Sequence, residues 1–326
     1  MSSIPPTRPF AELHVHLRGT ISHAVAMSLA QRYGVTSSDI ATNKEFTFGG
    51  FDDFLHKYHL VGELVRGAQD YALVCHSYLA RVARSNTRYV ELMVSPDHAL
   101  DAGVTYAELL RALEPAIRDC EAKYGIACRL IVTAVRHRGP EAAEALARLV
   151  VATASTLVVG FGMCGNERVN TPSAFRSAFS LARQGGLKTT CHVGELCDAA
   201  HIREALDVLQ VDRLGHAIRS VGDDGLLREI ASRKIVVEVC PTSNVRLGLV
   251  ASFNVHPVFQ MLAAGVKVSV NTDDPAFMAT TMEDEFANLR AAGMTEEFVA
   301  ECVGNGWLGA FDPAAAKAAQ SRLPPP

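Results

Sequence analysis

The chain alternates short apolar runs with longer amphipathic segments, and this alternation constrains its fold more than any other feature. The apolar runs are residues 10–17, 88–94, 129–135, 157–161, 187–192, 213–216, 235–239 and 266–270. Runs of this length predict buried strands, and strand–helix–strand repeats predict a parallel sheet. Eight repeats favour an α/β fold of the closed (β/α)8 TIM-barrel type. An open doubly wound sheet is the main alternative, although no early strand is followed by Gly-x-Gly-x-x-Gly.

Helical segments are expected between these strands, with one insertion after the first. Amphipathic patterns cover residues 106–123, 140–154, 172–184 and 199–209, and residues 21–35 and 68–84 also look helical. Residues 46–67, rich in aromatic side chains, form a partly helical insertion after strand one. It is interpreted either as a lid over the barrel mouth or as ordinary packing against the outer wall. The absence of a linker predicts one domain over residues 1–326, with a disordered tail at 321–326.

Composition excludes several classes of protein. The 326 residues are 48% hydrophobic, enough for a large core. A net charge of −4 supplies no basic field for nucleic acid or anionic lipid. No apolar run reaches the length of a membrane span, and residues 1–9 lack the pattern of a signal peptide. A cytoplasmic enzyme with a small-molecule partner is therefore expected. The eight cysteines, none in a Cys-x-x-Cys pair, are expected to be mostly buried thiols.

Five short segments carry side chains suited to a metal ion and its water. They are His14-Val15-His16, His192-Val193-Gly194-Glu195, Leu214-Gly215-His216, Cys240-Pro241-Thr242-Ser243-Asn244 and Asn271-Thr272-Asp273-Asp274-Pro275. Four of them begin at, or lie just after, a predicted strand. Histidines and carboxylates gathered at the ends of parallel strands predict a metal-dependent hydrolase.

The spacing within these segments supports a metal site. Residues two apart on a strand share a face, which His14 and His16 would do. Glu195 follows His192 across a glycine, which allows a sharp turn. Adjacent carboxylates at Asp273 and Asp274 need a cation or separate donors if both are ionised, although Asp is also common in a turn before proline.

His216 ends a predicted strand, and two roles remain open from its position alone. It is either a fourth nitrogen ligand or a base that holds the metal-bound water.

Taken in order, the motifs resemble the adenosine deaminase family of the amidohydrolase superfamily. The resemblance runs from about residue 10 to residue 275. Besides the five segments, it includes Glu12-Leu13, Tyr89-Val90-Glu91, Arg136-His137 and Gly165-Asn166-Glu167. Several ordered motifs together are specific, whereas one alone is not.

The resemblance implies a zinc-dependent deamination at C6 of a 6-aminopurine nucleoside, with release of ammonia. It implies one zinc per subunit, although other divalent metals suit the same ligands. The implied ligands are His14, His16, His192 and Asp273. His216 would position and activate the water, and Glu195 would give a proton to purine N1. Asp274 would bond N7, and the Gly165 N–H would meet N3.

One residue departs from the family pattern. The family usually has an acidic residue where this chain has Arg18. A guanidinium cannot accept a hydrogen bond and favours carboxylate or phosphate. We therefore expect a substrate with an anionic group on the 5′ side, such as 6-aminodeoxyfutalosine of menaquinone biosynthesis, on whose phenyl ring the aromatic insertion could stack. The alternatives are a nucleotide deaminase of the N6-methyl-AMP type, or adenosine or adenine itself with Arg18 in solvent or paired with an acid.

Other classes fit the sequence less well. A two-metal amidohydrolase would need a bridging carboxylate or lysine on the fourth strand, and none is evident between residues 157 and 162. A secreted growth-factor relative would need a signal peptide. A metal-free structural barrel would leave the ordered histidines and acids without a role.

Overall fold

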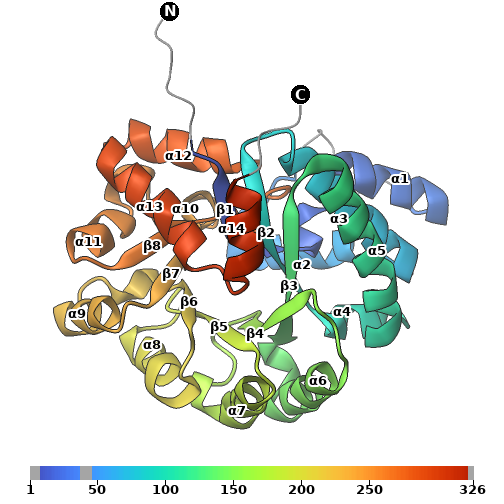
Figure 1. Ribbon diagram of the computed structural model, residues 1–326, viewed down its shortest axis with the longest axis horizontal. Helices are drawn as coiled ribbons and strands as arrows, with labels where there is room; N and C mark the ends of the chain where they lie inside the picture. Colours follow the sequence, from blue (N-terminus) through green and yellow to red (C-terminus); the bar gives the residue numbers. More distant parts are fainter. Residues whose placement is uncertain (1–7, 37–45, 322–326) are drawn as a thin grey trace, which may run out of the picture.

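The computed structural model describes residues 8–36 and 46–321 and contains one parallel sheet (Figure 1). The strands lie in sequence order from β1 to β8. They are β1 Phe10–His16, β2 Thr87–Val94, β3 Ala127–Val135, β4 Val158–Cys164, β5 Lys188–Val193, β6 Arg213–His216, β7 Val236–Val239 and β8 Lys267–Val270. Each predicted apolar run overlaps one of these strands.

The sheet closes where β1 meets the segment that follows β8. The N–H of His16 donates to the carbonyl of Asp273 at 2.9 Å, and the N–H of Asp273 donates to the carbonyl of His14 at 3.1 Å. Val15 and Asp273 form a parallel bridge between these two bonds. The predicted (β/α)8 barrel is confirmed, and the open doubly wound alternative is wrong.

Helices form the outer layer of the barrel (Figure 1). They are α1 His23–Tyr33, α2 Phe51–Gly62, α3 Ala68–Val82, α4 Pro96–Asp101, α5 Tyr106–Tyr124, α6 Pro140–Ala152, α7 Arg176–Gln184, α8 Ala199–Glu204, α9 Asp224–Ser232, α10 Pro241–Arg246, α11 Val258–Ala263, α12 Met282–Ala291, α13 Glu296–Leu308 and α14 Pro313–Gln320. Two predicted helices are less regular than expected. Residues 172–184 begin with a 3-10 turn, Pro172–Phe175, and residues 199–209 end in a π-helical turn, Ala205–Leu209.

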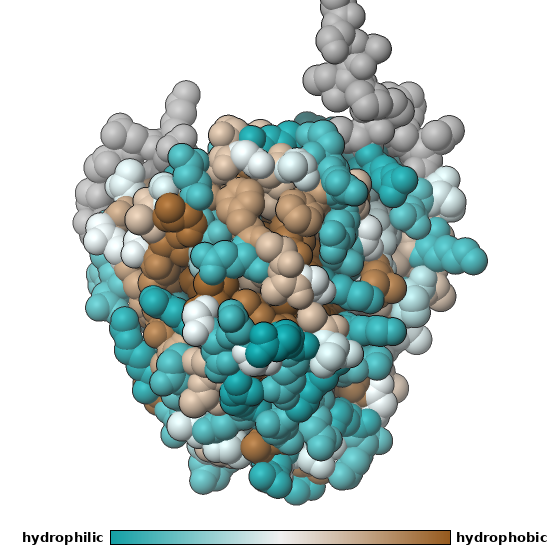
Figure 2. Space-filling model, turned by 90° about the vertical axis from the view of Figure 1, so that its left-hand side faces the viewer, coloured by the Kyte–Doolittle hydropathy of each residue, from teal (hydrophilic) through white to brown (hydrophobic). Residues whose placement is uncertain are grey.

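The surface of the outer layer is mixed. Figure 2 shows the side that lies on the left in Figure 1, where hydrophilic groups surround apolar groups gathered in its upper half. Within residues 8–36 and 46–321, no helix is both long and apolar enough to cross a membrane. All eight cysteines are free thiols, and seven of them are buried.

The aromatic insertion covers the mouth of the barrel. Phe51, Phe54, Leu55 and Tyr58 of α2 line a cavity that lies at the carboxyl ends of the strands. The ring of Phe277, after β8, packs against Phe54 and Tyr58 at centroid distances of 5.7 and 5.4 Å. These contacts favour the interpretation of residues 46–67 as a segment over the barrel mouth, rather than as packing against the outer wall. Most of the predicted disordered tail, residues 322–326, lies outside the described residues.

A buried carboxyl group ties α12 to the first turn of α10. The side chain of Glu285 accepts hydrogen bonds from the N–H of Thr242 and from the hydroxyl of Thr280, both at 3.0 Å. Burial raises the pKa of Glu285 to about 8, and these hydrogen bonds oppose the rise only in part. The folded protein therefore binds a proton between about pH 4.5 and pH 8 that the unfolded chain releases.

We predict that Glu285→Gln weakens the dependence of stability on pH. In the wild type the free energy of unfolding should fall as pH rises from 5 to 8, by up to about 1.4 kcal/mol per pH unit from this group. The amide cannot ionise, so the variant should gain stability over the wild type towards pH 8. Urea unfolding at pH 5, 6.5 and 8 measures this, with the exposed Glu301→Gln as control. Parallel curves for wild type and Glu285→Gln would contradict the prediction.

Candidate metal centre and active site

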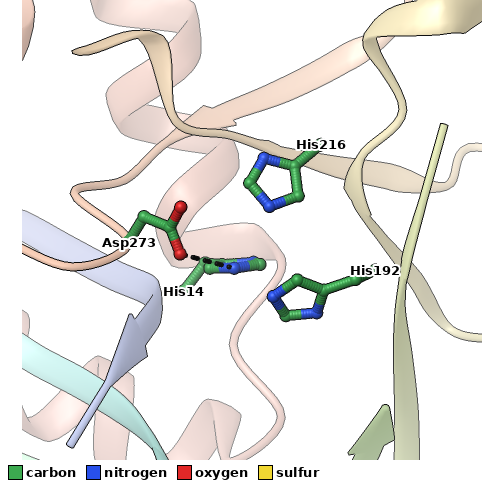
Figure 3. A group of neighbouring side chains, drawn as sticks. All are labelled: His14, His192, His216 and Asp273. Carbon is green, nitrogen blue, oxygen red and sulfur yellow. Dashed lines mark ion pairs between the residues drawn. The ribbon is translucent and has the colours of Figure 1, made fainter. Parts of the chain in front are cut away.

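Three imidazoles and one carboxylate meet at the carboxyl ends of the strands (Figure 3). His14 lies on β1, His192 on β5, His216 at the end of β6 and Asp273 just after β8. One nitrogen or oxygen atom from each lies within 4.8 Å of the others, and all four residues are buried. Imidazole nitrogen and carboxylate oxygen are ligands for divalent metals such as zinc. This group, which we call the His/Asp cluster, can therefore hold a divalent cation.

His16 reaches the same point from β1. Its Nε2 lies 2.9 Å from Nε2 of His192 and 3.3 Å from Oδ1 of Asp273, while Nε2 of His14 lies 3.4 Å from that same oxygen. The structure thus brings together all four predicted ligands and His216 as well. Nε2 of His14 is buried without a hydrogen-bond partner, which suits a nitrogen that faces a metal.

Barrel closure and a local irregularity set the direction of these side chains. The β1–β2 register shifts between Glu12 and Val15, so β1 holds one more residue than β2 beside His14. Such bulges re-aim side chains and are common next to active sites. The backbones of His216 and Asp273 have φ of 59° and 64°, a strained conformation for residues other than glycine. The surrounding structure holds both residues in that conformation.

Glu238 is a site residue that the sequence did not reveal. It lies on β7, and its Oε2 is 2.7 Å from Nδ1 of His14. Burial opposes charge on Glu238, but Arg213 and His14 outweigh it and lower its pKa to about 2. An ionised Glu238 accepts the Nδ1 proton of His14, which turns Nε2 toward the cluster. The only signal in the sequence was an acidic residue inside the apolar run 235–239.

Ser243 and Glu167 also support the site. The hydroxyl of Ser243 donates to Oδ2 of Asp273 at 2.7 Å, which leaves Oδ1 facing the histidines. Glu167 accepts the backbone N–H groups of four successive residues, among them Glu195 at 3.1 Å and Cys197 at 2.9 Å. Gly194, with φ of 70°, makes the predicted turn before Glu195. Ser243 and Glu167 both belong to motifs that resemble the family, but their spacing in the sequence did not indicate a role for either residue.

Electric charge is concentrated at His14 and Asp273. Burial opposes protonation of His14, but the carboxylates of Asp273 and Glu238 outweigh it and raise its pKa to about 10. Asp273 is also buried, yet its close contacts with His14 and His16 hold its pKa well below the usual range. In contrast, burial and the neighbouring imidazoles keep the pKa of His192 well below its usual value. The cluster therefore attracts positive charge around an ionised Asp273.

The pKa values of Glu195 and Asp274 shift upward, in the direction opposite to that of Asp273. Burial, followed by the nearby charge of Asp273, raises the pKa of both carboxyl groups well above their usual range. Burial therefore favours the protonated form of both carboxyl groups, which is the form that can donate a hydrogen bond. Glu195 lies next to His216, with 3.9 Å between Oε1 and Nε2.

The directions of the hydrogen bonds near His216 indicate which of its ring nitrogens carries the proton. The N–H of Val258 donates to Nδ1 of His256, so Nε2 of neutral His256 donates to the Asn244 oxygen at 3.3 Å. The Asn244 amide nitrogen in turn lies 3.4 Å from Nδ1 of His216. Burial lowers the pKa of His216 to about 3, so its ring is neutral. Its Nδ1 then accepts, and its Nε2 carries a proton toward the cluster.

The site opens into one cavity of about 290 Å3. Glu195, His216, Asp273, Asp274 and Gly165 all line it. Arg18 does not line this cavity but a smaller neighbouring one, behind His98 and Tyr58. The predicted residues thus meet in one place, with the exception of Arg18.

Comparison with known proteins agrees with this geometry. The adenosine deaminase family model matches residues 9–321. An adenine deaminase of Chelativorans sp. (strain BNC1) is 39% identical over 277 residues, 85% of each chain. The structure of an adenine deaminase from Arthrobacter aurescens superposes with a TM-score of 0.87 at 30% identity, covering 96% of this chain and 97% of that one. An amidohydrolase from Burkholderia ambifaria with bound Zn has the same TM-score at 29% identity, covering 96% and 89%.

The fold and the His/Asp cluster place this protein in the amidohydrolase class of (β/α)8 barrels. Within that class, the chain belongs to the adenosine deaminase family. It is therefore an enzyme, a hydrolytic deaminase of that family.

We predict that Glu238→Gln weakens metal binding. The neutral amide is a poorer acceptor for the His14 Nδ1 proton, and such losses typically cost about 10- to 100-fold in metal affinity. Arg213 keeps its ion pair with Glu91, 2.6 Å away, so the fold should survive. Metal per chain after dialysis against a weak chelator measures the effect. Glu285→Gln, a buried carboxyl remote from the histidines, should keep its metal, and equal metal content in both variants would contradict the prediction.

Proposed function

We propose that this protein removes the 6-amino group of an aminopurine by hydrolysis. The observation that carries the proposal is the meeting of the His/Asp cluster with two buried carboxyl groups of raised pKa, Glu195 and Asp274, in one cavity. A cation site supplies an activated water, and the two acids supply donors for ring nitrogens. The family to which the chain belongs supports this chemistry.

We assign His14, His16, His192 and Asp273 as ligands of one zinc ion. When bound, zinc would act as a Lewis acid and lower the pKa of a water ligand to roughly 7. His216 is left out of the ligand set because its Nε2 carries the proton and offers no lone pair. The bound Zn of the Burkholderia ambifaria amidohydrolase supports the choice of metal.

The chain's own residues would bind and polarise the purine. Glu195 would donate its proton to N1, which makes C6 more electrophilic. Asp274 would donate to N7, an acceptor, and the N–H of Gly165 would meet N3. His216 would donate from Nε2 to the attacking oxygen and so orient it toward C6. One proton of the attacking water would go to the departing amino group, which leaves C6 as ammonia, and the other would restore the carboxyl group of Glu195. C6 would keep the oxygen as a carbonyl, and N1 would keep its proton.

Two substrates within this class each have an observation in their favour. Adenine is supported by relatives named adenine deaminase, at 35–39% identity over about 85% of the chain. A 5′-modified anionic adenosine, such as 6-aminodeoxyfutalosine, is supported by the cavity itself. Beyond the cluster the cavity reaches the imidazoles of His59 and His137 and the guanidinium of Arg138, which forms an ion pair with Asp101, another lining residue. The aromatic rings of α2 would face a large substituent.

A substrate panel tests this function. The metal-loaded protein is assayed for ammonia release from adenine, adenosine, AMP and 6-aminodeoxyfutalosine. At least one of them should be turned over, and removal of metal by a chelator should abolish turnover. The ratios of kcat/KM identify the substituent: preference for adenine would exclude the anionic nucleoside. No ammonia from any of the four would contradict the proposed function.

We predict that Glu195→Gln lowers kcat by about 10²- to 10⁴-fold, because the amide cannot transfer a proton to the ring. The variant keeps the size of the side chain, and Glu167 still holds the surrounding backbone, so metal content should not change. Steady-state kinetics together with metal analysis separate the two effects. A kcat within threefold of the wild type would exclude Glu195 as the proton donor.

A further inference from the structure

Arg18 is the least satisfied of the buried arginines. Arg18 as a whole is only 8% exposed to solvent. Arg88 donates to three backbone carbonyls, and Arg213 pairs with two carboxylates. Arg18 makes one hydrogen bond, from Nη2 to the carbonyl of His98 at 3.3 Å, and Nε has no partner among the described residues. Within residues 8–36 and 46–321, no carboxylate lies within 4 Å of this guanidinium.

The guanidinium is confined by α2. A Cβ added at Gly62 would lie 2.7 Å from Nη1 of Arg18 and 2.9 Å from Cζ, so any larger residue there would require the guanidinium to move. Gly62 is the last residue of α2, where the helix dipole is negative, which partly offsets the positive charge. Arg18 also lines a small cavity, and its buried Nε remains without a partner among the described residues.

That cavity holds a second donor without a partner. Tyr71 of α3 is 2% exposed, and its hydroxyl proton has no acceptor among the described residues. Burial raises the pKa of Tyr71 while Arg18 lowers it, so the phenol and the guanidinium are neighbours. The cavity is lined by His16, Leu17, Arg18, Tyr58, Tyr71, Met93, Val94, Ser95 and His98. The space open to the centre of a water-sized sphere is about 10 Å3, room for one small ion or one water.

The charge around the cavity favours an anion over water. Burial lowers the pKa of the neighbouring His98 to about 2, and the positive charges of Arg18 and Arg138 act in the same direction. A buried cation without a counterion is costly, and an anion that accepts from two donors removes that cost.

We propose that this cavity binds one small inorganic anion, such as chloride, between the Nε–H of Arg18 and the O–H of Tyr71. The anion would lie beside the catalytic cavity and share His16, Tyr58 and His98 with it as lining residues. Since Arg18 packs against α2, the bound anion would hold that helix over the barrel mouth. The anion is bound by the folded protein whether or not it deaminates purines.

Thermal unfolding of the metal-loaded protein tests the site. The melting temperature is compared in sodium chloride and in sodium gluconate at equal ionic strength, because gluconate is too large for the cavity. We expect chloride to raise the Tm of the wild type by about 2 to 4 °C, with saturation. The increase should disappear in Tyr71→Phe and in Arg18→Met.

Tyr106→Phe is the matched control. The Tyr106 hydroxyl is also buried without a partner, but it lies on α5 and does not line this cavity. This variant should keep the full chloride effect. Tyr71→Phe loses a single oxygen, so the test remains decisive even if Arg18→Met does not fold. Crystals soaked in bromide should show an anomalous peak in the cavity of the wild type.

Two outcomes would overturn the proposal. The first is equal Tm in chloride and gluconate for the wild type, or a chloride effect that Tyr71→Phe retains. The second is no effect of chloride, combined with a raised KM of Tyr71→Phe for an anionic nucleoside only, which would assign the cavity to the substrate. Neither measurement of Tm requires turnover, so failure of the proposed deamination would leave this test intact.

Discussion

Closure of the barrel between β1 and the segment after β8 is the interaction on which the site depends. Two backbone hydrogen bonds join Asp273 to His14 and His16. The same bonds that complete the sheet therefore bring a carboxylate beside two imidazoles that are more than 250 residues away in the chain. His192 and His216 join them because β5 and β6 end at the same edge. The hydrogen bonds that close the barrel therefore also assemble the cluster.

Buried charge in this protein is arranged so that neighbouring groups differ in protonation. Asp273 and Glu238 remain ionised because imidazoles or Arg213 contact them. Glu195 and Asp274 line the same cavity, and burial together with the charge of Asp273 raises the pKa of both carboxyl groups well above the usual range. One cavity therefore contains ionised groups suited to a cation and protonated groups suited to a purine. Burial alone would have protonated all four, and the specific contacts decide which ones resist.

Helix α2 connects the two cavities. One face of it carries the aromatic rings that line the catalytic cavity, and its end at Gly62 packs against Arg18. Groups that bind in either cavity would therefore act on the position of the same helix. Arg18 is therefore linked to the catalytic cavity through α2, although its side chain does not line that cavity.

Sequence by itself determined the barrel, its eight strands and the residues of the cluster, because periodicity and the placement of polar side chains at strand ends are local properties. Only the tertiary structure decided that Glu238 orients His14, that His216 carries its proton on Nε2, and that Arg18 faces a separate cavity. These outcomes depend on distances between side chains from different strands and helices. The sequence places Glu238 inside an apolar strand but does not show which side chain it will contact. It places Arg18 two residues after His16, but β1 contains an extra residue, so this spacing does not predict the direction in which the Arg18 side chain extends.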